Sequence, residues 1–383
     1  AKSPPLSSTI YLIEKNKTTY QSYHGMQTTL PHFNSMGSDT VSYHTRKNSF
    51  NLPSVFIKYD MTSWLSVRYA NTKTLTRPDY SDIVPLYNIQ GNASSVIYRN
   101  PFLEPGVSKN NDYVLTLYQD KLGLLSFSYF TKKIDDLIYS SGRRFITDPN
   151  DYDLPHYTEK YQIIDYKTNN PYGVSLKGFE IDYQTRFWYL PEILRGLVFN
   201  ANYTRTTSEV KYPRTIIKQE IVFEPSFQVI TSNVDSFYVD RLLDQPNDIV
   251  NLSLGYDYKG FSGRISMLHI SDIFKTTSFW PELRETTDAY TRFDLSIKQK
   301  LPIKGLEIFM NVNNMYEAID VNRLRGFNRA DPTFTNEMYE DLISNQQNSN
   351  VMDRLNTIPT ESRAKSLEQH YGRTIDLGFR FNF

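Results

Sequence analysis

The most constraining feature of this chain is an alternation of apolar and polar residues that recurs in segment after segment. Successive side chains of a β-strand point to opposite faces, so a period of two predicts strands with one apolar and one polar face. Between residues 250 and 258, for example, Val250, Leu252 and Leu254 alternate with Asn251 and Ser253. The pattern predicts about twelve strands. They span residues 8–14, 54–59, 65–69, 113–117, 125–129, 179–189, 197–203, 250–258, 261–267, 293–297, 306–312 and 375–383.

The connections between these predicted strands alternate between short and long. The five short ones are residues 60–62, 119–123, 191–196, 259–260 and 302–305, and the six long ones, read as loops, lie near 15–51, 71–111, 139–172, 206–248, 271–289 and 316–370. Loops longer than about 15 residues are uncommon in compact soluble domains. Outer-membrane barrels have tight periplasmic turns and long extracellular loops. We therefore predict an all-β fold, a transmembrane antiparallel up-and-down β-barrel, rather than a soluble sandwich.

Composition agrees with this class and excludes several others. Lys+Arg and Asp+Glu are both 42, so the chain lacks the basic excess of a nucleic-acid-binding protein, and we expect no nucleic-acid partner. Because there is no cysteine, disulfides, cysteine-ligated metals and a cysteine nucleophile are excluded. The 29 Tyr and 23 Phe suit the aromatic girdles of a membrane barrel.

In a membrane barrel the apolar face of each strand points to lipid and the polar face to the lumen. The polar positions carry charges of both signs, which predicts a hydrogen-bonded lumen packed against another element or a wet pore. Most of these residues are expected to be part of the wall rather than substrate contacts. The predicted lumenal residues are Glu180, Asp182, Arg186, Asn200, Asn202, Asp257, Arg264, Asp294, Lys298, Glu307, Asn311 and Arg380.

The C-terminal segment continues the alternation up to an aromatic last residue. Its apolar positions are Ile375, Leu377, Phe379, Phe381 and Phe383. An ordinary soluble domain usually ends in a polar, frayed tail. The order Asp376-x-Gly378-x-x-Phe381-x-Phe383 resembles the C-terminal signal by which outer-membrane β-barrels are recognised and inserted. The resemblance makes Asp376, Gly378, Phe381 and Phe383 the candidate barrel-assembly signal.

Short motifs between about residue 50 and residue 383 resemble the barrel of TonB-dependent receptors. Each is weak by itself, and their order and spacing carry the resemblance. They are Leu52-Pro53-Ser54, Arg77-Pro78-Asp79-Tyr80, Arg99-Asn100-Pro101-Phe102-Leu103-Glu104-Pro105, Ser108, Asn110-Asn111-Asp112-Tyr113, Lys177-Gly178-Phe179-Glu180, Asn202-Tyr203-Thr204 and Asn313-Asn314-Met315-Tyr316.

The resemblance implies a larger barrel than this chain supplies. Members of the family have roughly 22 strands around a plugged lumen. Residues 1–383 would then be the C-terminal portion of the β-barrel domain, with the plug domain and the TonB box outside this sequence. The family implies nutrient uptake across the outer membrane of a diderm bacterium, for a siderophore, glycan or peptide. Its partners would be outer-membrane lipid, the TonB energy-transducing complex and, in several relatives, a surface-exposed lipoprotein.

Residues with catalytic or ligand-binding chemistry are sparse, and we expect no catalytic, metal or cofactor site. The six histidines show no metal-ligand spacing, and His269 with Ser271 is a weak hint of a barrel hydrolase. Aromatic residues in the long connections could hold a sugar or peptide, but packing is the more common role. These are Tyr80, Tyr87, Tyr98, Phe145, Tyr152 and Tyr157. The alternative function is a self-contained barrel of about twelve strands that acts as a passive channel or membrane enzyme. A structural subunit of a larger complex has no positive signal.

Overall fold

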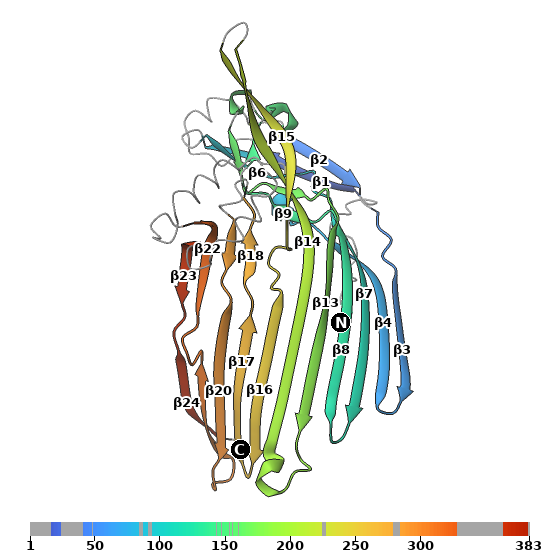
Figure 1. Cartoon of the computed structure of the whole chain (residues 1–383), viewed down its shortest axis with the longest axis vertical. Helices are drawn as coiled ribbons and strands as arrows, with labels where there is room; N and C mark the ends of the chain where they lie inside the picture. The colour runs from blue at the N-terminus through green and yellow to red at the C-terminus, as the bar shows by residue number, and fades with distance from the viewer. Residues whose placement is uncertain are drawn as a thin grey trace.

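The computed structural model describes residues 17–23, 41–47, 49–83, 87–90, 94–142, 144–146, 148–152, 154, 156–159, 161–223, 227–278, 284–327 and 363–381. Its main element is a 12-stranded antiparallel sheet that curves around one side (Figure 1). The strands, in their order across the sheet, are β3 (Ser54–Thr62), β4 (Leu65–Thr76), β7 (Gly106–Gln119), β8 (Gly123–Asp135), β13 (Val174–Arg186), β14 (Leu197–Val222), β16 (Asp248–Tyr258), β17 (Phe261–Ile270), β20 (Tyr290–Lys300), β21 (Leu306–Asn313) and β24 (Thr374–Phe381), with β15 (Gln228–Asp240) paired to the far part of β14.

Neighbours in the sheet are neighbours along the chain, which is the up-and-down topology predicted from the alternation. The five predicted short connections are all present and lie at one end of the sheet (Figure 1). Between β16 and β17, Lys259 and Gly260 both have positive φ, 46° and 82°, as a two-residue type I′ hairpin turn requires. The first turn is displaced from its predicted position at residues 60–62, because β3 continues to Thr62 through an irregularity after Asp60.

The long connections contain regular structure that the sequence analysis did not predict. Residues 206–248 were expected to be a loop, but β14 continues to Val222 and pairs with β15 along its whole extension. This hairpin projects well beyond the rest of the sheet (Figure 1). The expectation of a loop over residues 15–51 is also wrong in part, since β1 (Lys17–Tyr23) pairs with β2 (Val41–Lys47).

The other long connections form a layer of small sheets at the end of the main sheet opposite the short connections, which we call the long-connection end. One sheet joins β5 (Tyr87–Gln90), β6 (Ser95–Tyr98), β10 (Arg144–Phe145) and β11 (Gln162–Ile164). The short helix η5 (Glu192–Gly196) lies at the other end of the sheet, in the short connection between β13 and β14. The remaining elements of the layer are β9 (Ile138–Ser140) paired with β12 (Lys167–Asn169), a sheet of β18 (Ile273–Thr276), β19 (Glu285–Thr287), β22 (Ile319–Phe327) and β23 (Arg363–His370), and the short helices α2 (Tyr80–Ile83), η3 (Pro149–Tyr152) and η4 (His156–Thr158). We call these elements, together with the β14–β15 extension, the loop layer.

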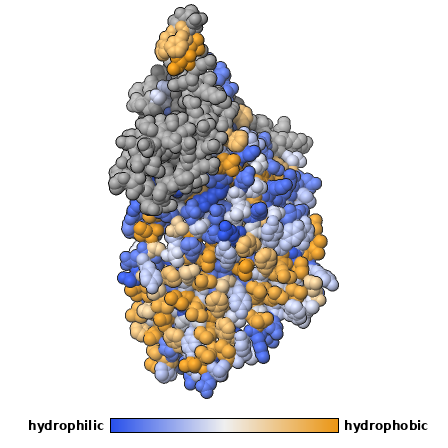
Figure 2. Space-filling model, in the orientation of Figure 1, coloured by the Kyte–Doolittle hydropathy of each residue, from blue (hydrophilic) through white to orange (hydrophobic). Residues whose placement is uncertain are grey.

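The strand register assembles the alternating side chains into two continuous faces. On one face, a single row crosses seven strands and is almost wholly apolar: Tyr59, Val67, Leu115, Phe127, Ile181, Tyr203 and Val250. This face continues to β24, where Leu377 is 77% exposed and Phe379 is 76% exposed. Figure 2 shows apolar residues concentrated over the lower part of the molecule, with more hydrophilic residues above them. We call this apolar surface the outward face.

The edges of the sheet are β3 and β24. In the described part of the chain, β3 pairs with β4 and β24 with β21, and neither has a neighbour on its other side. The predicted antiparallel fold is therefore confirmed, and the sheet is open rather than closed upon itself. The predicted strand at residues 8–14 lies outside the described residues. None of the helices in the described ranges is long and apolar enough to cross a membrane.

Candidate functional site

The polar face of the sheet is the first candidate site. All twelve predicted lumenal residues lie on this face, because the register keeps them in phase across β13, β14, β16, β17, β20, β21 and β24. Their side chains are connected by hydrogen bonds across the strands. Asn202 Nδ2 donates to Glu180 Oε1 at 2.6 Å, and Arg380 Nη1 donates to Glu307 Oε1 at 3.1 Å. The wall is therefore hydrogen-bonded within itself.

A shallow groove of about 300 Å³ runs along the middle of this face. Its polar lining consists of amides, hydroxyls, two carboxylates and one guanidinium: Asp182, Gln184, Asn200, Asn202, Asn251, Ser253, Ser266, Arg292 and Asp294. Gln184 Nε2 donates to Asp182 Oδ1 at 2.9 Å, and Arg292 Nε donates to Asp294 Oδ2 at 3.1 Å. Such a surface offers both donors and acceptors to a polar segment or solute.

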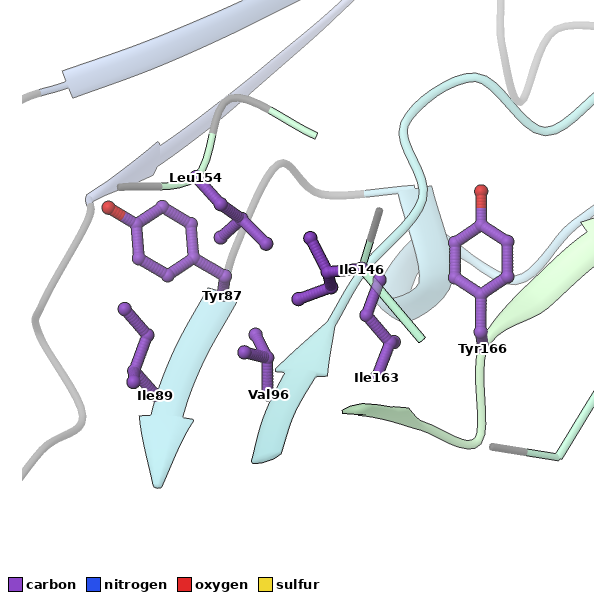
Figure 3. Packing of buried hydrophobic residues seen from close by; sticks show 7 residues of the cluster. All are labelled: Tyr87, Ile89, Val96, Ile146, Leu154, Ile163 and Tyr166. Atoms are coloured by element: carbon purple, nitrogen blue, oxygen red, sulfur yellow. The ribbon is translucent and has the colours of Figure 1, made fainter. Parts of the chain in front are cut away.

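The loop layer is the second candidate site, and it contains the hydrophobic cores found in the described residues. One core holds Tyr87, Ile89, Val96, Ile146, Leu154, Ile163 and Tyr166, whose side chains converge between β5, β6 and the segments that follow β10 and precede β12 (Figure 3). Ile89, Val96 and Ile163 are fully buried. Because these residues come from two different long connections, their packing fixes one connection against the other.

A second core lies where the β14–β15 extension meets the sheet. It contains Tyr139, Val174, Val210, Tyr212, Tyr238 and Phe274. Arg284 is fully buried beside it and forms an ion pair with Asp240. The guanidinium carbon of Arg284 lies 4.8 Å from the Tyr238 ring centroid and 5.2 Å from that of Phe274. Stacking on two rings and pairing with a carboxylate together compensate the cost of burying this charge.

The motifs that resemble TonB-dependent receptors anchor the long connection over residues 71–111. Asp82 is almost fully buried and pairs with Lys167 at 2.7 Å and with Arg99 at 3.4 Å. The Asn100 amide donates to Tyr166 Oη at 3.2 Å and to the carbonyl of Lys167 at 3.0 Å. Two long connections that are distant in the sequence are thereby tied together. Arg99 and Asn100 are the motif residues that make these contacts.

The motif that follows β21 forms a turn. Asn314 has a positive φ of 54°, which asparagine tolerates better than most residues. Its backbone N–H donates to Asp294 Oδ1 at 2.9 Å. Its side-chain amide donates to the carbonyls of Ala318 and Gly372, at 3.1 Å and 3.0 Å. Asn314 therefore connects the end of β21 to the segment just before β24.

The loop aromatics divide into buried and exposed groups. Tyr87 is in the core, and Tyr98 and Tyr152 pack against it. Tyr80 is 49% exposed and Tyr157 is 43% exposed, so these two are accessible to a solute. Burial, with smaller contributions from Tyr87 and Tyr161, raises the pKa of Tyr157 to about 12, which keeps the phenol neutral. The side chain of Phe145 lies outside the described residues.

The weak hydrolase hint has a structural explanation. His269 Nδ1 lies 2.8 Å from Thr291 Oγ1, its neighbour on β20. Ser271 Oγ accepts hydrogen bonds from the backbone N–H groups of Asn247 and Asp248, at 2.9 Å and 3.0 Å. Both side chains thus connect adjacent strands.

The candidate assembly residues lie on both faces of β24. Asp376 and Gly378 are on the polar face, Phe381 is on the outward face, and Phe383 lies outside the described residues. Gly378 faces Phe309 on β21, and a Cβ built on Gly378 would lie 2.7 Å from Cζ of that ring. The ring covers the glycine, and the Arg380 guanidinium carbon lies 5.7 Å from the ring centroid.

Replacing Gly378 by valine is expected to destabilise the folded protein by about 1–3 kcal/mol, because the new side chain overpacks against Phe309. The measurement is the free energy of unfolding in detergent or lipid. Combining Gly378→Val with Phe309→Ala is expected to recover most of that loss, since the ring is removed. If insertion into membranes stays impaired in the double variant while its stability is restored, Gly378 acts as an assembly signal in addition to its packing role.

Comparison with known proteins gives the family. No curated protein matches the sequence. Among solved structures, the chain resembles a mutant of the ferric enterobactin receptor PfeA from Pseudomonas aeruginosa, with 14% identity and a TM-score of 0.44 over 73% of this chain and 35% of that one. The ferric-catecholate import receptor Fiu from K12 E. coli has 13% identity and a TM-score of 0.47, with 74% and 33% covered. The copper transporter OprC has 13% identity and a TM-score of 0.48, with 90% and 40% covered.

These likenesses concern the fold, and the chain spans 33% to 40% of the length of the three proteins. The family model described as TonB dependent receptor-like, beta-barrel matches residues 19–315, which is more than half of the chain. The predicted resemblance is thereby confirmed, and this chain belongs to the TonB-dependent receptor β-barrel family.

Proposed function

We propose that this chain is the C-terminal part of the barrel of an outer-membrane transporter that imports a nutrient with energy supplied through TonB. The observation that carries the proposal is a wall with an apolar outward face and a hydrogen-bonded polar face, within a chain of the TonB-dependent receptor family. Such a wall is suited to separate lipid from an aqueous or plugged lumen. The membrane in question is the outer membrane of a diderm bacterium.

The remaining strands and the plug are proposed to come from a part of the protein outside this sequence. Two observations support this division. Both edges of the described sheet are unpaired on one side, and the chain spans about a third of the length of the receptors PfeA and Fiu. A self-contained barrel would close β24 onto β3 or onto the predicted strand at residues 8–14, whereas β24 pairs only with β21 among the described residues.

The proposed substrate is a scarce solute such as a siderophore, a glycan or a peptide. The exposed tyrosines Tyr80 and Tyr157 belong to the loop layer, on the side where the family receives its substrate. The polar groove lies on the face of the sheet that would line the lumen. Partners would be outer-membrane lipid, the TonB complex through the plug-bearing part, and a surface-exposed lipoprotein above the loop layer.

A genetic uptake experiment tests this function. A strain that lacks the gene is expected to lose growth on one member of a panel of iron chelates, glycans and peptides. The wild-type gene should restore that growth, and it should fail to do so in a strain without TonB. Growth that is restored equally without TonB, together with steady conductance of the purified protein in planar bilayers, would instead establish a passive channel.

A further inference from the structure

We propose that the outward face of β4, β7, β8, β13 and β14 binds the phosphorylated headgroup of a lipid in the outer leaflet. The inference rests on the proposed function, since it requires the sheet to span the outer membrane with its long connections outside. The proposed lipid site is separate from the polar face of the sheet and from the loop layer. The evidence is an aromatic row, a group of basic residues beyond that row, and a depression between the basic residues.

The aromatic row marks where the outward face leaves the apolar region. Tyr69, Tyr113, Tyr129 and Phe179 are consecutive cross-strand partners on four adjacent strands. The ring centroids of Tyr69 and Tyr113 are 5.1 Å apart, and those of Tyr113 and Tyr129 are 6.4 Å apart. Barrel proteins place such girdles at the boundary between hydrocarbon and headgroups.

Basic residues follow this row on β4, β7, β8 and β13, on the same face and toward the long-connection end, and Arg205 on β14 is the cross-strand partner of Phe179 at the end of the row. We call Lys73, Lys109, Lys133, Lys177 and Arg205 the basic belt. Lys109 is the direct cross-strand partner of both Lys73 and Lys133. Like charges placed opposite each other destabilise a sheet, so an unbalanced row of lysines favours an anionic ligand.

Three acidic residues lie near the belt and leave it with a positive excess. Lys109 pairs with Asp135 at 3.2 Å, and Arg205 pairs with Asp248 at 3.6 Å. Glu209 lies near Lys177, in the lining of the same depression. Among the residues that the structure describes, Lys73, Lys133 and Lys177 form no ion pair. The belt therefore carries five basic side chains against three acidic ones.

A surface depression of about 370 Å³ lies within the belt. Its outward-facing lining residues are Thr131, Lys133, Ser175, Lys177, Thr207 and Glu209. The two ammonium groups and the hydroxyls of Thr131 and Ser175 can donate hydrogen bonds to phosphate oxygens, while the Thr207 hydroxyl donates to the carbonyl of Lys177 at 3.4 Å. Glu209 is the one acceptor-only carboxylate in this set, and it lies at the β14 side.

The height of the belt fits a headgroup rather than a dissolved anion. Lys133 is eight residues beyond Leu125, the first outward residue after the β7–β8 turn, which is about 27 Å along a strand. A strand tilt of about 35–45° reduces this to a height of about 20 Å, close to the roughly 25 Å apolar band of a barrel. On the β16 side the belt ends at an acidic residue, since the cross-strand partner of Arg205 is Asp248.

The test is a lipid titration of the full-length protein by native mass spectrometry. The probes are lipopolysaccharide with its phosphates, the same lipid after dephosphorylation, and inorganic phosphate. The phosphorylated lipid is expected to bind the wild type and to bind the double variant Lys133→Gln/Lys177→Gln about 30-fold more weakly. The matched control, Lys121→Gln/Lys304→Gln, removes two exposed lysines from turns at the other end and should bind like the wild type.

Three results would overturn the inference. They are equal binding of the dephosphorylated lipid, unchanged binding by the Lys133→Gln/Lys177→Gln variant, and complete displacement of the lipid by inorganic phosphate. Heat-modifiable migration on gels checks that each variant is folded. Nutrient uptake is a separate readout and should be unchanged in the double variant. If the wild-type gene restores growth equally without TonB, the proposed function is wrong, and this outcome can be told apart from a failure of lipid binding.

Discussion

Replacing Leu377 by arginine is expected to lower the free energy of unfolding by about 2–4 kcal/mol in a lipid bilayer, if the site lies near the bilayer midplane. Leu377 is 77% exposed on the outward face of β24, and its neighbours on that strand are Ile375 and Phe379. The cost arises because a guanidinium in hydrocarbon loses its hydration without gaining a partner. Folding titrations of the full-length protein into lipid vesicles measure it.

The matched control is Asn311→Arg, which adds the same side chain to the polar face of the adjacent strand. Asn311 is the cross-strand partner of Asp376, so the new charge would lie beside a carboxylate. We expect a much smaller loss of stability in this variant. Equal losses in the two variants would mean that β24 does not present one face to lipid, and the assignment of the outward face would then be wrong.

The wall was predictable because its determinants are local. Each spanning strand alternates within eight or more residues, so the sequence alone indicates which of its side chains share a face. The turn at Lys259 and Gly260 is equally local, since only its two residues need positive φ. The twelve predicted lumenal residues share one face because a period of two also fixes how neighbouring strands pair.

The loop layer was not predictable because its contacts join residues that are distant in the sequence. Lys167 and Asp82 pair across 85 residues, and Thr277 donates to the carbonyl of Ser140 across 137 residues. The β14–β15 extension was missed for a different reason. From Arg205 to Glu209 the strand is polar on both faces, and Pro213 follows four residues later, so the alternation that indicated the other strands is interrupted here.

The roles of Gly378 and Arg284 also depend on contacts that the sequence does not show. Gly378 was singled out as part of a terminal signal, but only the register shows that the Phe309 ring occupies the space above it. Arg284 gave no signal in the sequence at all. A lone arginine in a long polar connection is usually solvated, and its burial depends on Asp240, Tyr238 and Phe274, which come from two other segments.

Replacing Arg284 by methionine is expected to destabilise the loop layer by about 3–5 kcal/mol. Methionine keeps much of the side-chain volume but leaves Asp240, whose side chain is only 12% exposed, without its buried cationic partner. The effect should be local, because the sheet below is held by its own hydrogen-bonded ladders. Hydrogen exchange of the backbone amides in β15, β18 and β19 measures the free energy of opening this layer.

A second variant distinguishes charge burial from packing. In Arg284→Met combined with Asp240→Leu, neither charge is buried, so most of the lost protection should return. A purely steric role for Arg284 predicts the opposite, with the double variant at least as exchange-prone as the single one. Recovery would mean that the loss in the single variant comes from the unpaired charge of Asp240, and that opening the long connections for a solute is costly when it separates Arg284 from Asp240.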